Sequence, residues 1–316
     1  MTETYHKDRL LRKGLKTSHL RLLQALGEIG QLTAAAAAIG ISQPAASRLV
    51  AEIERIIGHP VHERSGRGIE MTAIGRALTL RAQRVVIELD DAARDLAEIA
   101  EGGIGHIRIG TVTGAALDRV LPALQAERKN SPNVRIDVVV AASEQLCAQL
   151  LAGRLDFALG RIPQGQQDKG LVFVRLEAEP LVLIARRGHP LLQHRQVTAA
   201  EALTFDWVMP SDEQLLTRTV VARLQALGLP LPSTQISTSS FLMTLALLQH
   251  SNSIAAVARA TAWQFAKGPD TGFGLVPVDL GFTVEPYGML AREKVSLPPA
   301  ALRLAGVIMA MEPQRG

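Results

Sequence analysis

A surface that could read DNA bases is formed by Gln43, Pro44, Ser47 and Arg48, near the amino terminus. Amide, hydroxyl and guanidinium groups hydrogen-bond to base edges in the major groove, where a recognition helix presents its first turns. A helical hairpin with a solvated polar face has the same spacing without touching DNA, so this pattern alone leaves both interpretations open.

The residues around this surface predict two short helices joined by a tight turn over 32–58. Thr33 is placed to cap the first helix, Gly40 to end it in the left-handed conformation, and Ser42 to cap the second. The second helix has an apolar stripe on the side opposite its polar surface, formed by Ala46, Leu49, Val50, Ile53, Ile56 and Ile57. We therefore expect a helix-turn-helix whose stripe packs on the core.

Residues 62–68 predict a glycine-bearing hairpin tip that carries Arg64 and Arg67. Such a wing grips phosphates or the minor groove, and its position beside a helix-turn-helix favours DNA as the partner. The charge distribution agrees, because residues 1–70 hold ten Lys and Arg against seven Asp and Glu in a chain of net charge +4.

Residues 72–101 predict one long helix with the seam of a coiled coil. Apolar residues recur at alternating steps of four and three, at Leu78, Ala82, Val85, Leu89, Ala92, Leu96 and Ile99. The alternative is a surface helix that packs on its own domain. A second chain covers a narrow seam better than the helix's own domain does, so we expect a two-fold dimer. Its contacts would be made by Leu78, Val85, Leu89 and Leu96.

After the glycines of 102–105, the pattern changes to short apolar strands that alternate with amphipathic helices. This alternation predicts a largely parallel α/β domain, large enough for two lobes, over 106–316. The predicted strands are 107–112, 134–140, 157–160, 181–185, 207–209, 253–257 and 287–291.

Hydroxyl-bearing residues follow several predicted strands at points where a helix begins, in 111–114, 141–144, 209–212 and 237–240. A helix cap explains any one of these segments. The carboxyl ends of strands in an α/β domain share a crevice, so together they predict a binding cleft. The large rings near these segments are Trp207, Phe241 and Trp263.

The signatures of enzymes are missing from the 316 residues. The sequence has no nucleophile elbow, P-loop, dinucleotide fingerprint or paired zinc histidines, so we expect no catalysis, metal or cofactor. Its single cysteine, Cys147, forms no internal disulfide and reads as a small buried residue. No apolar leader or 18-residue apolar stretch occurs, which predicts a cytoplasmic protein and disfavours the alternative of a transport solute-binding protein.

The amino-terminal part resembles the winged helix-turn-helix of LysR-type transcriptional regulators, a bacterial family. The residues that carry this resemblance are Leu22 to Leu26, Thr33, Ala35, Ala36, 41–48, Glu54, Gly58, Val61, Arg64, 66–68, Met71, Thr72 and Gly75. The resemblance implies that Gln43, Pro44, Ser47 and Arg48 read bases and that Thr33, Arg64 and Arg67 contact the DNA backbone. Alanines depart from the family's more polar pattern at positions 34, 37 and 38, which implies fewer phosphate contacts there.

Over the whole chain the resemblance implies a DNA-binding domain over 1–71, a linker helix over 72–101, a hinge over 102–105, and a two-lobed α/β effector domain over 106–316, similar to periplasmic binding proteins. It implies a homodimer or homotetramer on a palindromic operator, a sugar or an aromatic or organic acid as effector, and contact with RNA polymerase. The implied effector residues are Thr113, Gly114, Ser143, Arg161, Pro210, Ser211 and Ser239, with Arg161 as a carboxylate partner.

Overall fold

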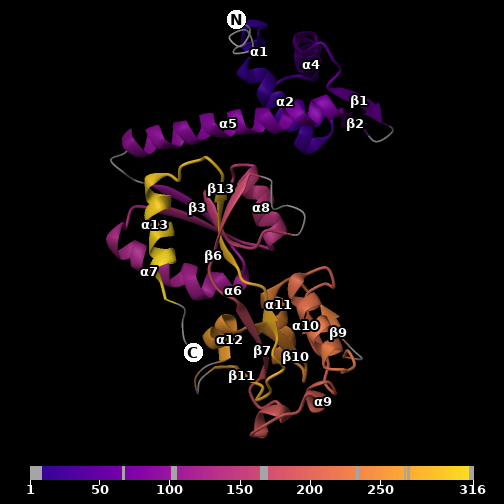
Figure 1. Cartoon of the computed structure of the whole chain (residues 1–316), viewed down its shortest axis with the longest axis vertical. Helices are drawn as coiled ribbons and strands as arrows, with labels where there is room; N and C mark the ends of the chain where they lie inside the picture. The colour runs from indigo at the N-terminus through magenta and orange to yellow at the C-terminus, as the bar shows by residue number, and fades with distance from the viewer. Residues whose placement is uncertain are drawn as a thin grey trace, which may run out of the picture. The chain divides into compact units, whose positions relative to one another are not determined.

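A computed structural model of the chain describes residues 9–65, 68–100, 105–163, 170–232, 235–266, 268 and 271–312. Its contacts form two compact units, Met1–Gly103 and Ile104–Gly316 (Figure 1). Across these described ranges, no helix is long and apolar enough to cross a membrane.

The first unit is a helical domain with a two-stranded wing and one long helix. Its elements are α1 (Arg9–Arg12), α2 (Thr17–Ile29), α3 (Leu32–Ala38), α4 (Gln43–Ile57), β1 (His62–Ser65), β2 (Gly68–Met71) and α5 (Ala73–Ala100). The strands β1 and β2 pair antiparallel, with Ser65 opposite Gly68. The predicted helix-turn-helix, wing strands and long helix are all present.

The turn between α3 and α4 forms as its residues predict. Gly40 has a φ of 73° in the left-handed region, and the next amide, Ile41 N, donates to Ala36 O at 3.0 Å. The Ser42 side chain accepts from Ala45 N and caps α4. The prediction that Thr33 caps α3 is wrong, because Leu32 packs against the core and is already helical, which makes Gln31 the N-cap residue.

The apolar stripe of α4 is buried as expected. Ala46, Val50 and Ile53 enter a core cluster with Leu22 and Leu26 of α2. Helix α5 packs along α2, and Ala82 of α5 joins the same cluster. Packing on one side therefore fixes which face of α4 remains available to a partner.

The second unit consists of two lobes. Lobe I has a five-stranded sheet in the order β4-β3-β5-β13-β6. Its elements are β3 (His106–Thr111), α6 (Thr113–Ala115), the π-helix η1 (Ala116–Val120), α7 (Leu121–Asn130), β4 (Arg135–Val140), α8 (Ser143–Leu151), β5 (Phe157–Gly160), β6 (Leu171–Arg175), β13 (Gly288–Arg292) and α13 (Pro299–Ala310). Helices α7 and α13 cover one face of the sheet and α8 covers the other.

Lobe II has a sheet in the order β11-β7-β10-β8-β9, with β12 also paired to β7. Its elements are β7 (Glu179–Arg186), the 3-10 helix η2 (Pro190–Gln193), α9 (Ala199–Ala202), β8 (Trp207–Met209), α10 (Leu215–Ala226), β9 (Gln235–Ser237), α11 (Phe241–Gln249), β10 (Ile254–Ala258), α12 (Arg259–Ala266), β11 (Phe273–Leu275) and β12 (Thr283–Val284). Helices α9 and α10 pack on one face, and α11 and α12 on the other.

The two sheets are mixed, so the prediction of largely parallel sheets is wrong. Strands β4, β3 and β5 are parallel, as are β9, β8 and β10. In contrast, β13 runs antiparallel to β5 and β6, and β7 runs antiparallel to β10, β11 and β12. The antiparallel pairs arise because the chain leaves lobe I after β6 and returns to it through β13.

The two crossings between the lobes lie side by side and form a hinge. Leu176 N donates to Tyr287 O at 3.0 Å, and Tyr287 N donates to Glu177 O at 3.0 Å. The pairing continues into lobe I between β6 and β13, and into lobe II between β7 and β12. An antiparallel ribbon of two strands therefore connects the lobes.

Candidate DNA-reading surface and effector cavity

The base-reading residues predicted on α4 lie together on its first turns. Gln43, Pro44 and Arg48 are exposed and Ser47 is half-buried. Gln43 Nε2 donates to Ser47 Oγ at 3.2 Å, and Arg48 Nε donates to Pro44 O at 3.4 Å. These contacts remain within one helix, so the polar groups can exchange them for an external partner. Thr33 is exposed on α3.

The wing follows α4 and is built by β1 and β2. The backbone of Arg64 pairs with Ile69 across the hairpin. The side chain of Arg64, and the whole of Arg67, lie outside the residues that the structure describes. Their predicted contacts with the DNA backbone therefore remain predictions.

The predicted seam of α5 divides into two parts. Leu78 packs against the core of its own domain. Farther along the helix, Val85, Leu89 and Leu96 are 46%, 50% and 67% exposed. The second part of the seam is therefore available to another chain, whereas Leu78 is already covered by residues of its own domain.

The predicted effector residues gather at one edge of each lobe. In lobe I, the segments that carry Thr113, Ser143 and Arg161 follow the adjacent parallel strands β3, β4 and β5. In lobe II, Pro210 and Ser211 follow β8 and Ser239 follows the neighbouring β9. The carboxyl ends of parallel strands meet as the sequence predicts, although these residues fall into two groups.

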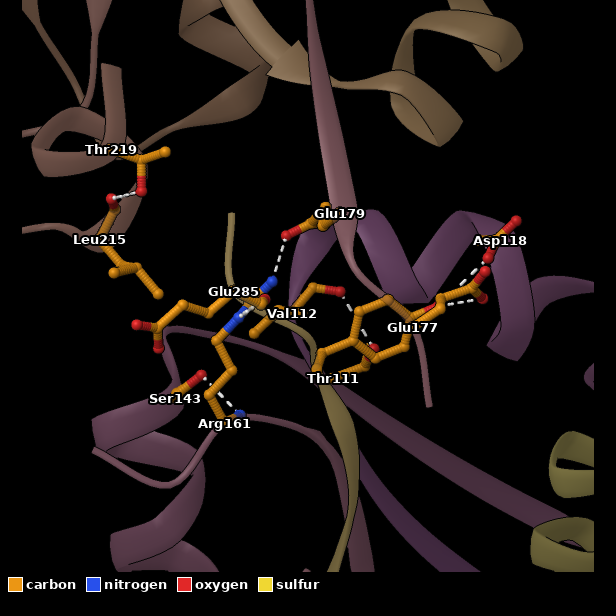
Figure 2. Close-up of polar contacts among 11 residues, drawn as sticks. Thr111, Val112, Asp118, Ser143, Arg161, Glu177, Glu179, Leu215, Thr219 and Glu285 are labelled. Carbon is orange, nitrogen blue, oxygen red and sulfur yellow. Dashed lines mark hydrogen bonds and ion pairs between the residues drawn. The ribbon is translucent and has the colours of Figure 1, made fainter. Parts of the chain in front are cut away.

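Arg161 is held by residues of its own chain (Figure 2). Its Nη2 donates to Glu179 Oε2 at 2.7 Å, and its Nε donates to Glu285 O at 2.7 Å. Its backbone N donates to Ser143 Oγ at 3.1 Å. Because Glu179 and Glu285 lie on the two strands of the hinge, Arg161 ties lobe I to both of them.

A cavity of about 100 Å³ lies between the lobes, beside the hinge. Lobe I, the hinge and helix α12 of lobe II all contribute to it. Its walls are formed by Gly114, Asp118, Glu177, Ala178, Glu179, Pro180, Arg259, Ala260, Trp263 and Tyr287. Gly114 lies close to Glu179, because a Cβ at this position would be 1.8 Å from Glu179 Oε1 and would displace that side chain.

A buried ion pair supports the acidic wall of this cavity. Arg119 of η1, only 3% exposed, donates from Nε to Glu177 Oε1 at 2.9 Å and from Nη1 to Met311 O. Tyr287 Oη lies 3.0 Å from Glu177 Oε1 and 3.1 Å from Asp118 Oδ2. Figure 2 shows Asp118 and Glu177 side by side.

This arrangement changes the acidity of the groups in it. Burial, followed by the negative charge of Glu177, raises the pKa of the Asp118 carboxyl. Burial and the two carboxylates raise the pKa of the Tyr287 phenol. The phenol has one proton and two acceptors, so a protonated Asp118 can supply the second hydrogen bond.

Arg259 differs from the other charged residues of the cavity. It begins α12 directly after β10 and is exposed. Throughout the described part of the chain, Arg259 has no hydrogen-bond or ion-pair partner. It therefore presents a positive charge that the described residues do not neutralise.

Comparison with known proteins assigns the chain to a family. The description "LysR substrate binding domain" matches residues 100–311, and "Bacterial regulatory helix-turn-helix protein, lysR family" matches residues 17–76. The chain belongs to the LysR family of transcriptional regulators. This LysR-family regulator thus has a DNA-binding helix-turn-helix and an effector-binding domain, as its fold predicts.

Two curated relatives are each described as the HTH-type transcriptional regulator GbpR. This LysR-family regulator is 39% identical to the one from Rhizobium radiobacter, over 79% of its own length and 83% of the relative's. It is 34% identical to the one from Azospirillum brasilense, over 92% and 85% of the two lengths. Among solved structures, CbnR complexed with its target DNA has a TM-score of 0.61 and 20% identity, over 93% of this regulator and 99% of CbnR.

Several residues of the LysR-family regulator's cavity were missed by the sequence prediction. Trp263 was anticipated and lines the cavity, but Trp207 is a wholly buried core residue whose indole N–H donates to Ala202 O. Arg259 could have been found, because it lies just after a predicted strand. Asp118 and Tyr287 carried no local signal, since their neighbours in space are distant in sequence.

No group of three or more His, Cys, Asp or Glu side chains suited to a metal occurs within the described ranges. Cys147 is buried, and burial raises the pKa of its thiol to about 11, which disfavours the reactive thiolate.

Proposed function

We propose that this LysR-family regulator binds a palindromic operator as a homodimer or a homotetramer and responds to a small metabolite held between its lobes. The helix-turn-helix over 1–71 reads the DNA, the helix over 72–101 pairs two chains, and 106–316 hold the effector. The predicted hinge at 102–105 connects the two domains, and its residues 102–104 lie outside the described part of the chain. The exposed seam at Val85, Leu89 and Leu96 supports the pairing.

We assign base reading to Gln43, Pro44, Ser47 and Arg48. This assignment is supported by the position of the four residues on the first turns of α4, opposite the face that packs on the core. The proposed backbone contacts are Thr33, Arg64 and Arg67. A dimer places two such helices on half-sites separated by turns of the DNA helix, which is why a palindrome is expected.

The effector site is the cavity lined by both lobes and the hinge, and this shared lining is the observation that carries the proposal. Gly114 lies in its wall. The remaining predicted residues at the strand ends are placed to contact the ligand when the lobes close, and they are Thr113, Ser143, Arg161, Pro210, Ser211 and Ser239.

The charges of the cavity favour an organic acid over a neutral sugar. Glu177 and Asp118 are both paired with Arg119, and Glu179 is paired with Arg161. Among the described residues of the cavity wall, Arg259 is then the charge without a partner, and a guanidinium prefers a carboxylate. Trp263 supplies an apolar face in the same wall.

Effector binding must change the relative stability of two arrangements of the lobes if it is to change DNA binding. A ligand that contacts lobe I, lobe II and the hinge has different contacts when the lobes open, so it favours the closed arrangement. Closure of the lobes would move the linker helices, and this movement would change the spacing between the two recognition helices.

A thermal-shift screen of the full-length chain tests this proposal. Aromatic and hydroxylated carboxylates are compared with neutral monosaccharides, because a ligand of the native state raises the melting temperature. We expect the carboxylates to stabilise the wild type and Arg259→Gln to abolish their effect. The exposed Arg195→Gln, outside the cavity, is the control. Stabilisation by sugars alone, unchanged in Arg259→Gln, would support the neutral ligand and reject the acid.

A further inference from the structure

The base of the wing is held by a glutamate of the recognition helix. Val61 N donates to Glu54 Oε1 at 2.9 Å, and His62 Nδ1 lies 3.1 Å from the same oxygen. Val61 is buried in the domain core, and His62 opens strand β1. A single carboxylate of α4 therefore fixes the point where the chain enters the wing.

The first turn of the linker helix holds the same residues from the other side. Thr72 N donates to Val61 O at 3.1 Å, and Thr72 Oγ1 donates to Pro60 O at 2.9 Å. Thr72 Oγ1 also accepts from Gly75 N at 3.0 Å. A Cβ at Gly75 would lie 1.8 Å from Val61 O, so α5 approaches the wing more closely than a side chain allows.

Glu54 itself lies beyond the proposed base-reading residues. It follows the last of them, Arg48, by six helical positions, which at 1.5 Å each is about 9 Å along the axis of α4. A carboxylate would also repel DNA phosphate rather than bind it. Any contribution of Glu54 to DNA affinity must therefore act through the residues that it holds.

We propose that Glu54 is a positioning residue for DNA binding, which together with Thr72 and Gly75 joins the recognition helix, the wing and the start of the linker helix into one rigid body. The inference rests on the proposed function of the wing in gripping the DNA backbone. It assigns Glu54 no contact with DNA. Its effect is to hold the wing at one fixed distance from α4.

A double-mutant cycle between Glu54→Ala and Arg67→Ala tests this assignment in the full-length chain, with operator affinity measured over a range of salt concentrations. We expect Arg67→Ala to weaken binding about tenfold in the wild type and less than about twofold when Glu54 is already replaced. Each single variant should lower the salt slope by about 1, because each removes the wing's phosphate contact.

The matched control is Glu52→Ala, on the same helix. Glu52 contacts His19 of α2 instead of the wing, so this variant should leave the salt slope and the effect of Arg67→Ala unchanged. Circular dichroism checks that each variant is folded. If Glu54→Ala does not fold, Thr72→Val removes the hold on the wing from the α5 side and should reduce the effect of Arg67→Ala in the same way.

The outcomes separate the two proposals. An undiminished effect of Arg67→Ala in the Glu54→Ala background, or in the Thr72→Val background where that variant is used, would overturn the positioning role while leaving the wing's function intact. If Arg67→Ala has no effect in the wild type, the proposed contact of Arg67 fails. In that case a lowered salt slope in Glu54→Ala supports the positioning role through the rest of the wing, and an unchanged slope overturns it.

Discussion

The reading surface of α4 and the cavity between the lobes differ in what their polar groups already bind. Gln43 and Arg48 are exposed and bond only within their own helix. In the cavity, Glu177 and Glu179 are bound to arginines from other elements, and Arg119 is almost completely buried. The polar groups of the α4 surface are therefore independent of the surrounding fold, whereas those of the cavity help to hold the effector domain together.

This difference predicts how each surface tolerates change. Residues on an exposed helix face can be replaced with little effect on stability, so DNA specificity can change while the fold is preserved. Replacing one member of a buried ion pair leaves an uncompensated charge, so a change of effector specificity in the cavity also destabilises the domain. The following predictions test or refine this contrast.

The largest effect is expected for Glu177→Ala. Arg119 then loses its nearer carboxylate while it remains buried, and it keeps the longer contact between its Nε and Asp118 Oδ2 at 3.6 Å. We therefore expect a loss of up to about 3 kcal/mol of unfolding free energy, at or below the lower end for a broken buried pair. Denaturant unfolding measures the loss. Glu293→Ala is the control, because its pair with Lys294 is exposed and worth less than about 1 kcal/mol. Equal losses of unfolding free energy in the two variants would contradict the view that the ion pairs of the cavity stabilise the domain more than exposed pairs do.

Leu89→Glu should break the dimer and leave the single chain folded. Leu89 is 50% exposed in one chain, and burial of each leucine in a dimer contributes about 1.5–3 kcal/mol. Sedimentation at micromolar concentration should show monomers. Leu80→Glu is the matched control, since Leu80 is exposed on the same helix but lies off the seam. A stable Leu89→Glu dimer would rule out the coiled coil.

Arg48→Ala should weaken binding to the operator by about 1–3 kcal/mol and relax its sequence preference, with less than about 0.5 kcal/mol lost in stability. Arg55→Ala, on the last turn of the same helix, serves as the control. Binding to operator and random DNA is measured by fluorescence anisotropy. Equal losses on both DNAs would mean that another surface reads the bases.

The smallest effect is expected from the titration of Asp118. Because the pKa of Asp118 is raised in the fold, the folded chain keeps a proton that the unfolded chain releases. The stabilisation that this proton gives to the folded state is complete below the ordinary pKa of 3.8 and is lost as the pH rises through the raised pKa. As the pH rises from 3.8 through the raised pKa of Asp118, the wild type should lose stability relative to Asp118→Asn, in which an amide replaces the neutral acid. Parallel stability curves would show that Asp118 is not protonated in the fold.

Local signals predicted most of the DNA-binding domain. Gly40 and Ser42 act within one turn of the chain, so their types suffice to place the ends of α3 and α4. Thr33 shows the limit of this reasoning, because the packing of Leu32 starts the helix before the residue with the better capping side chain. The predicted strands of the effector domain also occur, each within two residues of its expected ends.

The cavity could be predicted only in part. Gly114 and Trp263 were found because they follow strands, and the strand before Arg259 was also visible. The polar contacts of the hinge residues were not predicted, since the partners are separated by up to 169 positions in the sequence, as in the hydrogen bond between Tyr287 and Asp118. The antiparallel direction of β13 was not predicted for the same reason, because its return to lobe I depends on contacts between residues that are distant in the sequence.

The return of the chain through β13 also sets an order for folding. Residues 179–284 of lobe II form an uninterrupted segment, whereas the sheet of lobe I needs β13 to join β5 and β6 from beyond that segment. Pairings across such long stretches form slowly, and domains fold as they emerge during synthesis. Lobe II can thus complete its core on the ribosome while β5 still has one open edge and β6 has no strand partner, and lobe I closes only when nearly the whole chain has been made.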